Sequence, residues 1–174
     1  ETYYTLIQKL EQENIKIYDS KEEILPNIKN FPNHFKKLEG LEWKTSQDIP
    51  IPENIVHTRT PFLQWMKECN NFYENHYGVD LVAIRNKEYI GSTDIHIYPR
   101  SEPHKAWTGS LGVLRKFRRK GVATALKIKA IEKLLKKGVK EIRTDNEKNN
   151  PMFKINLALG FKPVPFSHDY SKTI

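Results

Sequence analysis

Cysteine and long hydrophobic runs are nearly absent from this chain of 174 residues. The single cysteine, Cys69, excludes a disulfide within the chain and favours an intracellular, cytoplasmic location. No apolar stretch approaches the roughly 20 residues that a membrane-spanning helix needs, and no signal peptide is visible, so we expect no membrane partner. No His, Cys, Asp or Glu residues have the spacing of a metal site, so we also expect no metal.

Positive charge, by contrast, is abundant and unevenly placed. The chain has 29 Lys and Arg against 21 Asp and Glu, a formal net charge of +8. Twelve of the 29 cations lie between Arg115 and Arg143, where only Glu132 and Glu141 oppose them. This concentration favours an anionic partner, such as a nucleotide-like cofactor, a nucleic acid or a membrane surface.

The length and the hydrophobic content of 38% suit one globular domain over residues 1–174. In the first 79 residues, elements are predicted at 1–12, at 15–18, and from Thr60-Pro61 onward, where a proline opens a helix. Ser20 followed by Glu23 has the capping-box spacing, which predicts a helix capped by Ser20. The apolar face after Pro61, which includes Leu63, is expected in the core.

From residue 80 the pattern changes to an alternation of strands and helices. Strands are predicted at 81–84, 89–98, 107–114 and 141–144 and from Phe161, with helices at 121–137 and 151–159 and a polar loop at 99–105. The continuous apolar run 81–84 is typical of a strand buried on both faces. This order predicts an α/β sheet with a right-handed crossover.

The stretch from Leu111 to Leu126 places a cluster of cations between an apolar strand and a long helix. Helix N-termini carry unpaired amides and the positive end of the helix dipole, so they bind phosphate groups. Gly121 would leave no side chain to block a ligand, and Arg118, Arg119 and Lys120 would add charge. The stretch therefore predicts a pyrophosphate site, with a solvated helix cap as the alternative.

These residues resemble the GCN5-related N-acetyltransferases (GNAT). Arg118-x-x-Gly121-x-Ala123 is similar to the pyrophosphate loop of that family. Asn146 and Asn149, followed by Gly160-Phe161, are similar to its second signature. The detailed resemblance covers about residues 80–165 and is looser before them.

The resemblance extends to a bacterial branch in which two such domains often occur in tandem. It is carried by Asp48-Ile49-Pro50, followed by the helix at Thr60-Pro61. A chain that begins at Glu1 would fit the second half of such a protein, so a second GNAT domain or a homodimer partner is an open expectation.

The resemblance implies an α/β (α+β) fold with a mixed, strongly twisted sheet flanked by helices and with acetyl-CoA between two splayed parallel strands. Residues 1–79 would form the helical, substrate-side portion and residues 80–174 the acetyl-CoA-binding core. The implied cofactor contacts are Leu111, Gly112 and Val113 for the pantetheine arm, Arg118, Arg119, Lys120, Gly121, Val122, Ala123 and Thr124 for the phosphates, and Asn146 and Asn149 near the thioester.

The implied reaction is direct attack of an amine on the acetyl thioester. Asp94 and His96, on one strand and one face, are the best general-base candidates. The alternative is that they are only solvated polar residues. Many family members place a tyrosine, which protonates the leaving thiolate, where this chain has Asn156. An amide is no acid, so either another group gives that proton or Asn156 only contacts the cofactor.

The expected function is therefore N-acetyl transfer from acetyl-CoA to a primary amine of a small molecule or peptide. Polyamines, aminoglycosides, amino acids and protein amines all remain open as acceptors. The basic surface disfavours cationic acceptors unless acidic residues cluster locally. The alternatives are a non-catalytic acyl-CoA-binding domain and a basic nucleic-acid-binding module, although no recognised nucleic-acid motif accompanies the basic helix.

Overall fold

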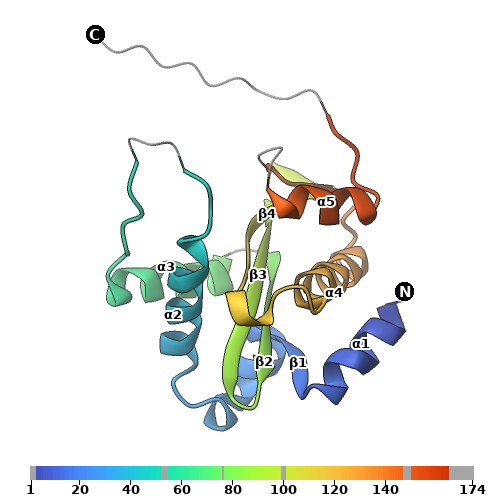
Figure 1. Ribbon diagram of the computed structural model, residues 1–174. Coiled ribbons are helices and arrows are strands. Elements are labelled where there is room, and N and C mark those ends of the chain that lie inside the picture. Colours follow the sequence, from blue (N-terminus) through green and yellow to red (C-terminus); the bar gives the residue numbers. More distant parts are fainter. Residues whose placement is uncertain (1–2, 52–54, 76, 99–100, 147–149, 165–174) are drawn as a thin grey trace.

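A five-stranded mixed sheet in the order β1-β2-β3-β4-β5 forms the centre of the molecule (Figure 1). The computed structural model describes residues 3–51, 55–75, 77–98, 101–146 and 150–164. The strands are β1 Ile15–Asp19, β2 Tyr77–Arg85, β3 Glu88–Tyr98, β4 Glu102–Val113 and β5 Glu141–Arg143. The first four pair antiparallel and β5 pairs parallel to β4, which confirms the predicted mixed α/β fold.

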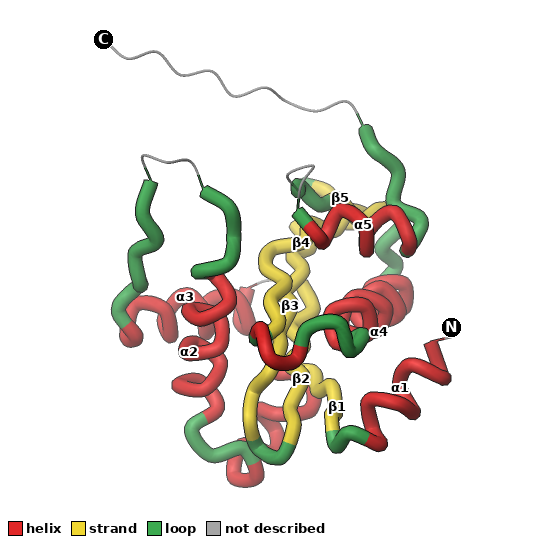
Figure 2. The backbone as a smooth tube through the Cα atoms, viewed as in Figure 1, coloured by secondary structure: helices red, strands yellow, loops and turns green. Residues whose placement is uncertain are grey.

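Helices cover both faces of this sheet (Figures 1 and 2). The α-helices of the described residues are α1 Tyr3–Gln12, α2 His34–Ser46, α3 Phe62–Asn75, α4 Val122–Lys136 and α5 Pro151–Ala158, with short 3-10 or π turns at Ser20–Ile24, Leu25–Asn30 and Arg115–Phe117. Helices α1 and α4 pack on one face, α2 and α3 on the other, and α5 lies beside α4. No helix in the described ranges is long and apolar enough to cross a membrane.

Strand β2 is buried on both faces, as its continuous apolar run predicts. Leu81 and Ala83 belong to the core under α1 and α4, while Val82 contributes to a second core under α2. All three side chains are completely buried. The sheet therefore separates two hydrophobic cores, and the helices on each side are held by burial of their apolar stripes.

The prediction that Ser20 caps a helix is wrong by one residue. Asp19 is the N-cap: its Oδ1 accepts from the Glu22 amide at 2.8 Å, and Glu23 Oε2 accepts from the Asp19 amide at 2.7 Å. Asp19 has the extended backbone that a cap needs because it is also the last residue of β1. Ser20 is instead completely buried.

Two strand boundaries also differ from the prediction. Strand β4 begins at Glu102 rather than Trp107, so part of the expected polar loop is strand. Polar residues are tolerated there because this end is the sheet's periphery, where Lys105 faces Glu141 of β5. The predicted strand at Phe161 is wrong as well, since residues 161–164 form no strand.

The apolar face of α3 lies differently from the prediction. Leu63 is 76% exposed, so it does not belong to the core. The less exposed stripe contains Phe62, Trp65, Met66, Cys69 and Phe72, with Tyr73 buried at its end. That spacing follows the helical period, which turns Leu63 outward.

Candidate active site

The N-terminus of α4 presents unpaired backbone amides. Gly121 is the N-cap, with a left-handed φ of 86°, and no side chain in the described part of the chain caps the helix. The first intrahelical bond runs from the Ala125 amide to the Gly121 carbonyl at 2.9 Å. The amides of residues 122–124 are therefore the helix's orphan donors, the arrangement that binds phosphate.

Gly121 has a structural role that could not be predicted from its place in the motif. A Cβ at this position would lie 2.4 Å from Cδ1 of Leu6 on α1. The missing side chain therefore makes room for α1, and the positive φ requires glycine as well. The prediction that Gly121 serves to clear a path for a ligand is untested by this geometry.

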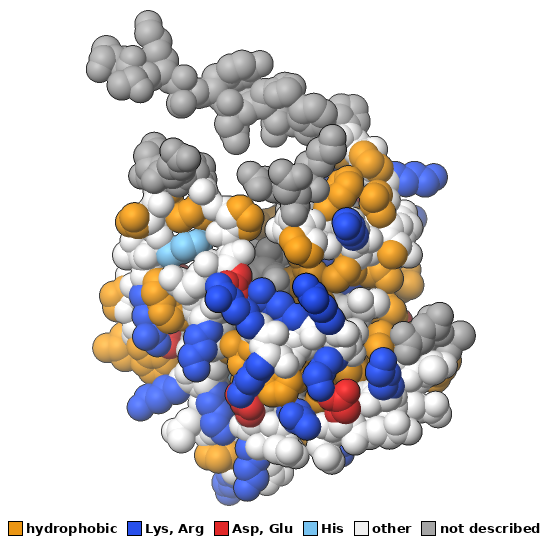
Figure 3. Space-filling model, viewed as in Figure 1, with side chains coloured by type: hydrophobic (Ala, Val, Ile, Leu, Met, Phe, Trp, Pro, Cys, Tyr) orange, Lys and Arg blue, Asp and Glu red, His pale blue; other side chains and the backbone are white. Residues whose placement is uncertain are grey.

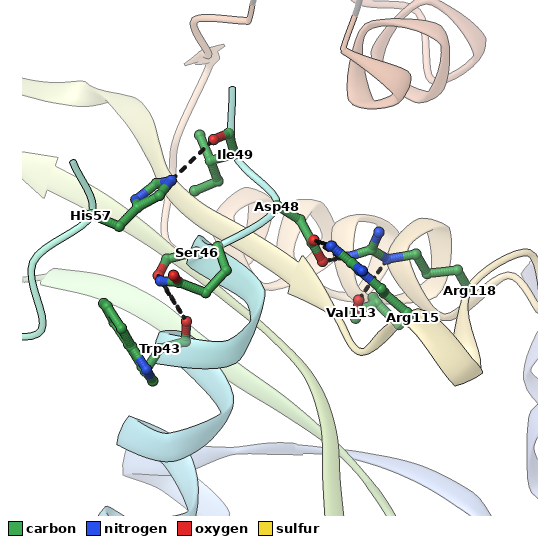
Figure 4. A network of polar contacts seen from close by, with 9 residues as sticks. Trp43, Ser46, Asp48, Ile49, His57, Val113, Arg115 and Arg118 are labelled. Carbon is green, nitrogen blue, oxygen red and sulfur yellow. Dashed lines mark hydrogen bonds and ion pairs between the residues drawn. The ribbon is translucent and has the colours of Figure 1, made fainter. Parts of the chain in front are cut away.

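The cations before α4 are partly paired with acids. Asp48, from the connector after α2, pairs with both Arg115 and Arg118, and the Arg115 Nε–Oδ1 distance is 2.9 Å (Figure 4). Arg118 Nε also donates to the Val113 carbonyl at 2.8 Å. Lys120 Nζ lies 2.5 Å from Glu13 Oε2.

The surface around this segment nevertheless remains rich in Lys and Arg. Figure 3 shows their side chains gathered across the middle of the face on which residues 115–120 run in Figure 1. Arg119 is exposed, with a left-handed φ of 61°. The local field therefore still favours an anion.

Strand β4 has an open edge beyond its short pairing with β5. The two strands pair only from Lys105 to Trp107, whereas β4 continues to Val113. At the point of divergence, Thr108 Oγ1 is buried without a hydrogen-bond partner in the described ranges. An extended chain carrying amides, such as a pantetheine arm, fits a strand edge of this kind.

Asp94 and His96 lie together, as predicted, but they bind one another and the sheet. Asp94 Oδ2 is 2.7 Å from His96 Nε2, and Oδ1 accepts from the Ser110 amide at 2.8 Å. Burial tends to raise the pKa of Asp94, yet the hydrogen bonds from His96 and Ser110 outweigh it, and the pKa is lowered. Asp94 is thus a weak base that secures the irregular pairing of β3 with β4 near Ser110.

A pocket of about 330 Å³ lies between α2, the segment before α3, α3 itself and β4. Its β4 wall is made by Ser110, Leu111 and Gly112, which include backbone expected to hold the pantetheine arm. On the opposite wall, His57 Nε2 is 3.2 Å from the Ile49 carbonyl (Figure 4). The pocket and the open strand edge therefore share the same three residues.

Two glutamates on α2 line this pocket. Trp65 Nε1 donates to Glu42 Oε2 at 2.8 Å, and Arg59 makes two bonds of 2.7 Å to Glu39. Burial raises the pKa of Glu42 to about 8; the bond from Trp65 opposes the shift, and the charges of nearby carboxylates add to it. The hydrogen bond to Arg59 lowers the pKa of Glu39.

Neither glutamate was predicted as a site residue from the sequence. The sequence did contain one sign of them. Glu39 and Glu42 are three residues apart, just before Trp43, and this spacing places two side chains next to each other on a helix. They lie in the part of the chain where the family resemblance is loose.

Asn156 belongs to a chain of polar groups between α4 and α5. Lys127 Nζ donates to Asn156 Oδ1, and Asn156 Nδ2 donates to Asn146 Oδ1. Lys127 is only 3% exposed, and its Nζ lies 4.6 Å from the centre of the Phe161 ring. Burial lowers the pKa of Lys127 to about 8. Asn149, the other predicted contact in this region, lies outside the described residues.

A mixed sheet in which two neighbouring parallel strands diverge is the fold of a class of acyltransferases that use acetyl-CoA. The sequence model of the acetyltransferase (GNAT) family matches residues 39–161, and the chain belongs to this family. No curated protein matches the chain. Within the described ranges, no three His, Cys, Asp or Glu side chains are grouped so that they could hold a metal ion.

Solved structures share the fold at low sequence identity. The aminoglycoside acetyltransferase AAC(6')-Iy, solved with a bisubstrate analogue of CoA and acetylneamine, has a TM-score of 0.65 and 19% identity, over 92% of this chain and 99% of its own. A putative acetyl transferase from Pyrococcus furiosus has a TM-score of 0.64 and 18% identity, over 91% and 99%. AAC(6')-IG from Acinetobacter haemolyticus has a TM-score of 0.61 and 18% identity, over 91% and 99%.

Proposed function

We propose that this protein transfers an acetyl group from acetyl-CoA to a primary amine held in the pocket beside α2. The observation that carries the proposal is that Ser110, Leu111 and Gly112 line the pocket and also lie on the open edge of β4. A thioester laid along that edge and an amine in the pocket would meet at these residues. Holding two reactants in this way supplies much of the rate in such transfers.

In this proposal, the protein binds acetyl-CoA through backbone more than through side chains. The amides of residues 122–124 would bind the pyrophosphate, and the exposed cations before α4 would complement the 3′-phosphate. The β4 edge from Leu111 to Val113 would bind the pantetheine arm. When bound, acetyl-CoA supplies the activated acetyl group, and the residues of this chain orient it.

The pocket favours an acceptor that is cationic in solution, although the outer surface is basic. Glu39 and Glu42 line it, and the buried Asp80 and the partly buried Asp94 are further acids near Glu42. These acids form the local cluster that a cationic acceptor requires on so basic a protein. Because structural relatives act on aminoglycosides, we propose a small polyamine or amino sugar as the acceptor class.

Glu42 is the general base in this proposal. Its pKa of about 8 is close to working pH, where a base is both available and strong enough to take the proton of the amine. Asp94 is less suited because its oxygens are already occupied by Ser110 and His96.

The proposal is tested by CoA binding and by transfer, with a matched pair of variants at Thr124. Thr124→Glu puts a negative charge in the first turn of α4, which stabilises the helix but repels a phosphate. Thr124→Gln adds nearly the same volume without charge. We expect calorimetry to show at least tenfold weaker CoA binding for Thr124→Glu and binding near the parent's for Thr124→Gln.

Transfer is then measured by thiol release from acetyl-CoA with a panel of polyamines, aminoglycosides, amino acids and peptides. Release that depends on a small cationic amine supports the proposal. Tight CoA binding without release for any amine would favour the non-catalytic acyl-CoA-binding alternative. Absence of CoA binding by the parent chain would overturn the proposal.

A further inference from the structure

Lys127 is a buried cation without an anion. It is 3% exposed, and no carboxylate in the described part of the chain pairs with it. Its Nζ donates to the side-chain carbonyl oxygen of Asn156 and lies over the face of the Phe161 ring. The partly buried Lys133 of the same helix differs, since it is paired with both Asp19 and Glu22.

Such a group costs stability unless something compensates it. A buried ammonium normally pairs with a carboxylate, or loses its proton, because water no longer solvates its charge. The depressed pKa of Lys127 shows that cost in this protein. Neither the Asn156 carbonyl oxygen nor the Phe161 ring neutralises the ammonium, so the position is suited to an anion that arrives from elsewhere.

The neighbours of Lys127 connect it to the segment that follows β5. Asn156 holds the ammonium and in turn donates to Asn146, which follows the end of β5. The chain of contacts thus runs from α4 across α5 to the strand that diverges from β4. Asn156 also occupies the place where many family members have the tyrosine that protonates the leaving thiolate.

We propose that the ammonium of Lys127 stabilises the thiolate released from acetyl-CoA. The inference rests on the proposed function. As the amine nitrogen bonds to the acetyl carbon, the carbon–sulfur bond breaks and its electron pair goes to sulfur, where the charge of Lys127 balances it. Glu42 takes the proton lost by the amine and passes it to solvent, and the thiolate takes a proton from solvent when CoA leaves.

Asn156 has a positioning role in this arrangement. Its amide cannot donate a proton at neutral pH, but its carbonyl oxygen accepts from the ammonium and limits the directions in which Nζ can point. The pairing of a lysine with an asparagine therefore stabilises the thiolate by charge, where the tyrosine protonates it.

The test is the ionisation of the thiol of free CoA bound to the protein, followed by the ultraviolet absorbance of the thiolate. Three variants are compared with the parent: Lys127→Met, Lys127→Gln and the control Lys129→Met. Lys127→Gln keeps an N–H donor for Asn156 on a slightly shorter side chain and removes the charge. Lys129 lies on the other flank of α4, where its Nζ donates to the Ile17 carbonyl at 2.5 Å.

We expect bound CoA to be at least tenfold richer in thiolate at neutral pH in the parent and in Lys129→Met than in either Lys127 variant. A group that only fastens α4 to α5 would leave Lys127→Gln like the parent. Lys127→Gln should fold at least as stably as the parent, because an unpaired buried charge is removed while Asn156 keeps a donor. Lys127→Met also leaves the Asn156 carbonyl oxygen without that donor, so its stability is measured beside its CoA titration.

The outcomes separate this inference from the proposed function. If all four proteins bind CoA equally by calorimetry and its thiol titrates identically in each, the role of Lys127 is overturned while the CoA site stands. If the parent does not bind CoA, the proposed function fails first, and the inference fails with it.

Discussion

Glu42 has a partly buried carboxyl group that accepts a hydrogen bond from Trp65 and lines the pocket, so its ionisation should control the proposed acetyl transfer. The carboxylate forms as the pH rises through about 8. We expect the ratio of parent to Glu42→Gln in kcat/KM to rise through that pH and then level at about 100-fold. The acceptor amine titrates identically in both proteins, so the ratio isolates Glu42.

Stability provides the control for this variant. The folded-state pKa of Glu42 lies above the ordinary value of 4.5, so the folded protein holds this proton more tightly than the unfolded chain does. Glu42 therefore costs stability increasingly as the pH rises from 4.5 to about 8. Glu42→Gln should gain stability relative to the parent across this range in urea denaturation. A ratio of kcat/KM that does not vary with pH would exclude Glu42 as the base.

His34, which is not part of the pocket lining, should make the folding stability of the protein sensitive to acid. It is 1% exposed, its Nδ1 lies 3.0 Å from the Tyr89 hydroxyl, and burial lowers its pKa from 6.5 to about 4. The unfolded chain thus binds a proton that the folded protein does not bind between these values. The stability contributed by neutral His34 is complete above pH 6.5 and is lost as the pH falls toward 4.

The measurement is urea denaturation of the parent and His34→Gln at several pH values. The stability of the parent should fall relative to the variant by up to about 1.4 kcal/mol per pH unit in this window. The comparison is needed because the pKa of Asp80, raised to about 7 by burial, acts with the opposite sign. Parallel stability curves for the two proteins would show that His34 is not the sensitive group.

At the scale of single elements, the junction of α1 with α4 depends on Gly121. Gly121→Ala adds a methyl group 2.4 Å from Leu6 Cδ1 on a backbone with positive φ. Gly138, which follows the other end of α4, has a φ of 80°, and a Cβ added there would have no atom within 4 Å. Gly138→Ala therefore carries only the backbone cost.

We expect Gly138→Ala to lose about 1–2 kcal/mol and Gly121→Ala about 1–3 kcal/mol more, measured by urea denaturation. Equal losses would mean that the Leu6 contact costs nothing. The result bears on the site because a destabilised Gly121 variant would bind CoA poorly for a reason unrelated to phosphate. Thr124 is therefore the better position at which to test the phosphate site.

The elements that could be predicted from the sequence are those in which one periodic signal dominates. The apolar run of β2 and the stripe of α4, with Val122, Ala125 and Leu126, are buried as predicted. The boundaries of β4 and the cap at Asp19 could not be predicted, because each depends on pairing with another strand. The prediction that Leu63 lies in the core was wrong because hydrophobicity alone does not determine which side of α3 faces the sheet.

The candidate site also has one part that could be predicted from the sequence and another that could not. The α4 N-terminus is a local arrangement, readable from Arg118 to Ala123, and the helix begins after Gly121 as expected. That its amides bind a phosphate stays a prediction. The acidic pocket joins α2, the segment before α3, and β4, so no short motif contains it. Lys127 could not be distinguished from surface lysines, since its burial depends on α5 and Phe161.

At the scale of the whole molecule, the charges separate two kinds of surface. The exterior is basic, with a net charge of +8, whereas Glu39, Glu42, Asp80 and Asp94 place acids on the α2 and α3 side of the sheet. In the proposed function, an anionic cofactor and a cationic acceptor would thus each be attracted to a different part of one site. Strand β4 lies between the two parts, with α4 at its end and the pocket against its side.

Because the proposed CoA site joins α4 with β4, and α4 is backed by α1, binding should stabilise the fold as a unit. Ligand at a hundred times its Kd contributes about 2.7 kcal/mol. For a chain of this length, that corresponds to a rise in Tm of roughly 5–10 °C. Thermal unfolding of the parent with and without CoA measures the rise.

Thr124→Glu is the matched control, since its Tm without ligand should equal or exceed the parent's. At the same CoA concentration its Tm should rise far less, while that of Thr124→Gln should follow the parent. An equal rise in all three proteins would place CoA away from the N-terminus of α4. The position of the anion site would then have to be sought elsewhere on the basic surface, because the shared residues of β4 alone do not complement a phosphate.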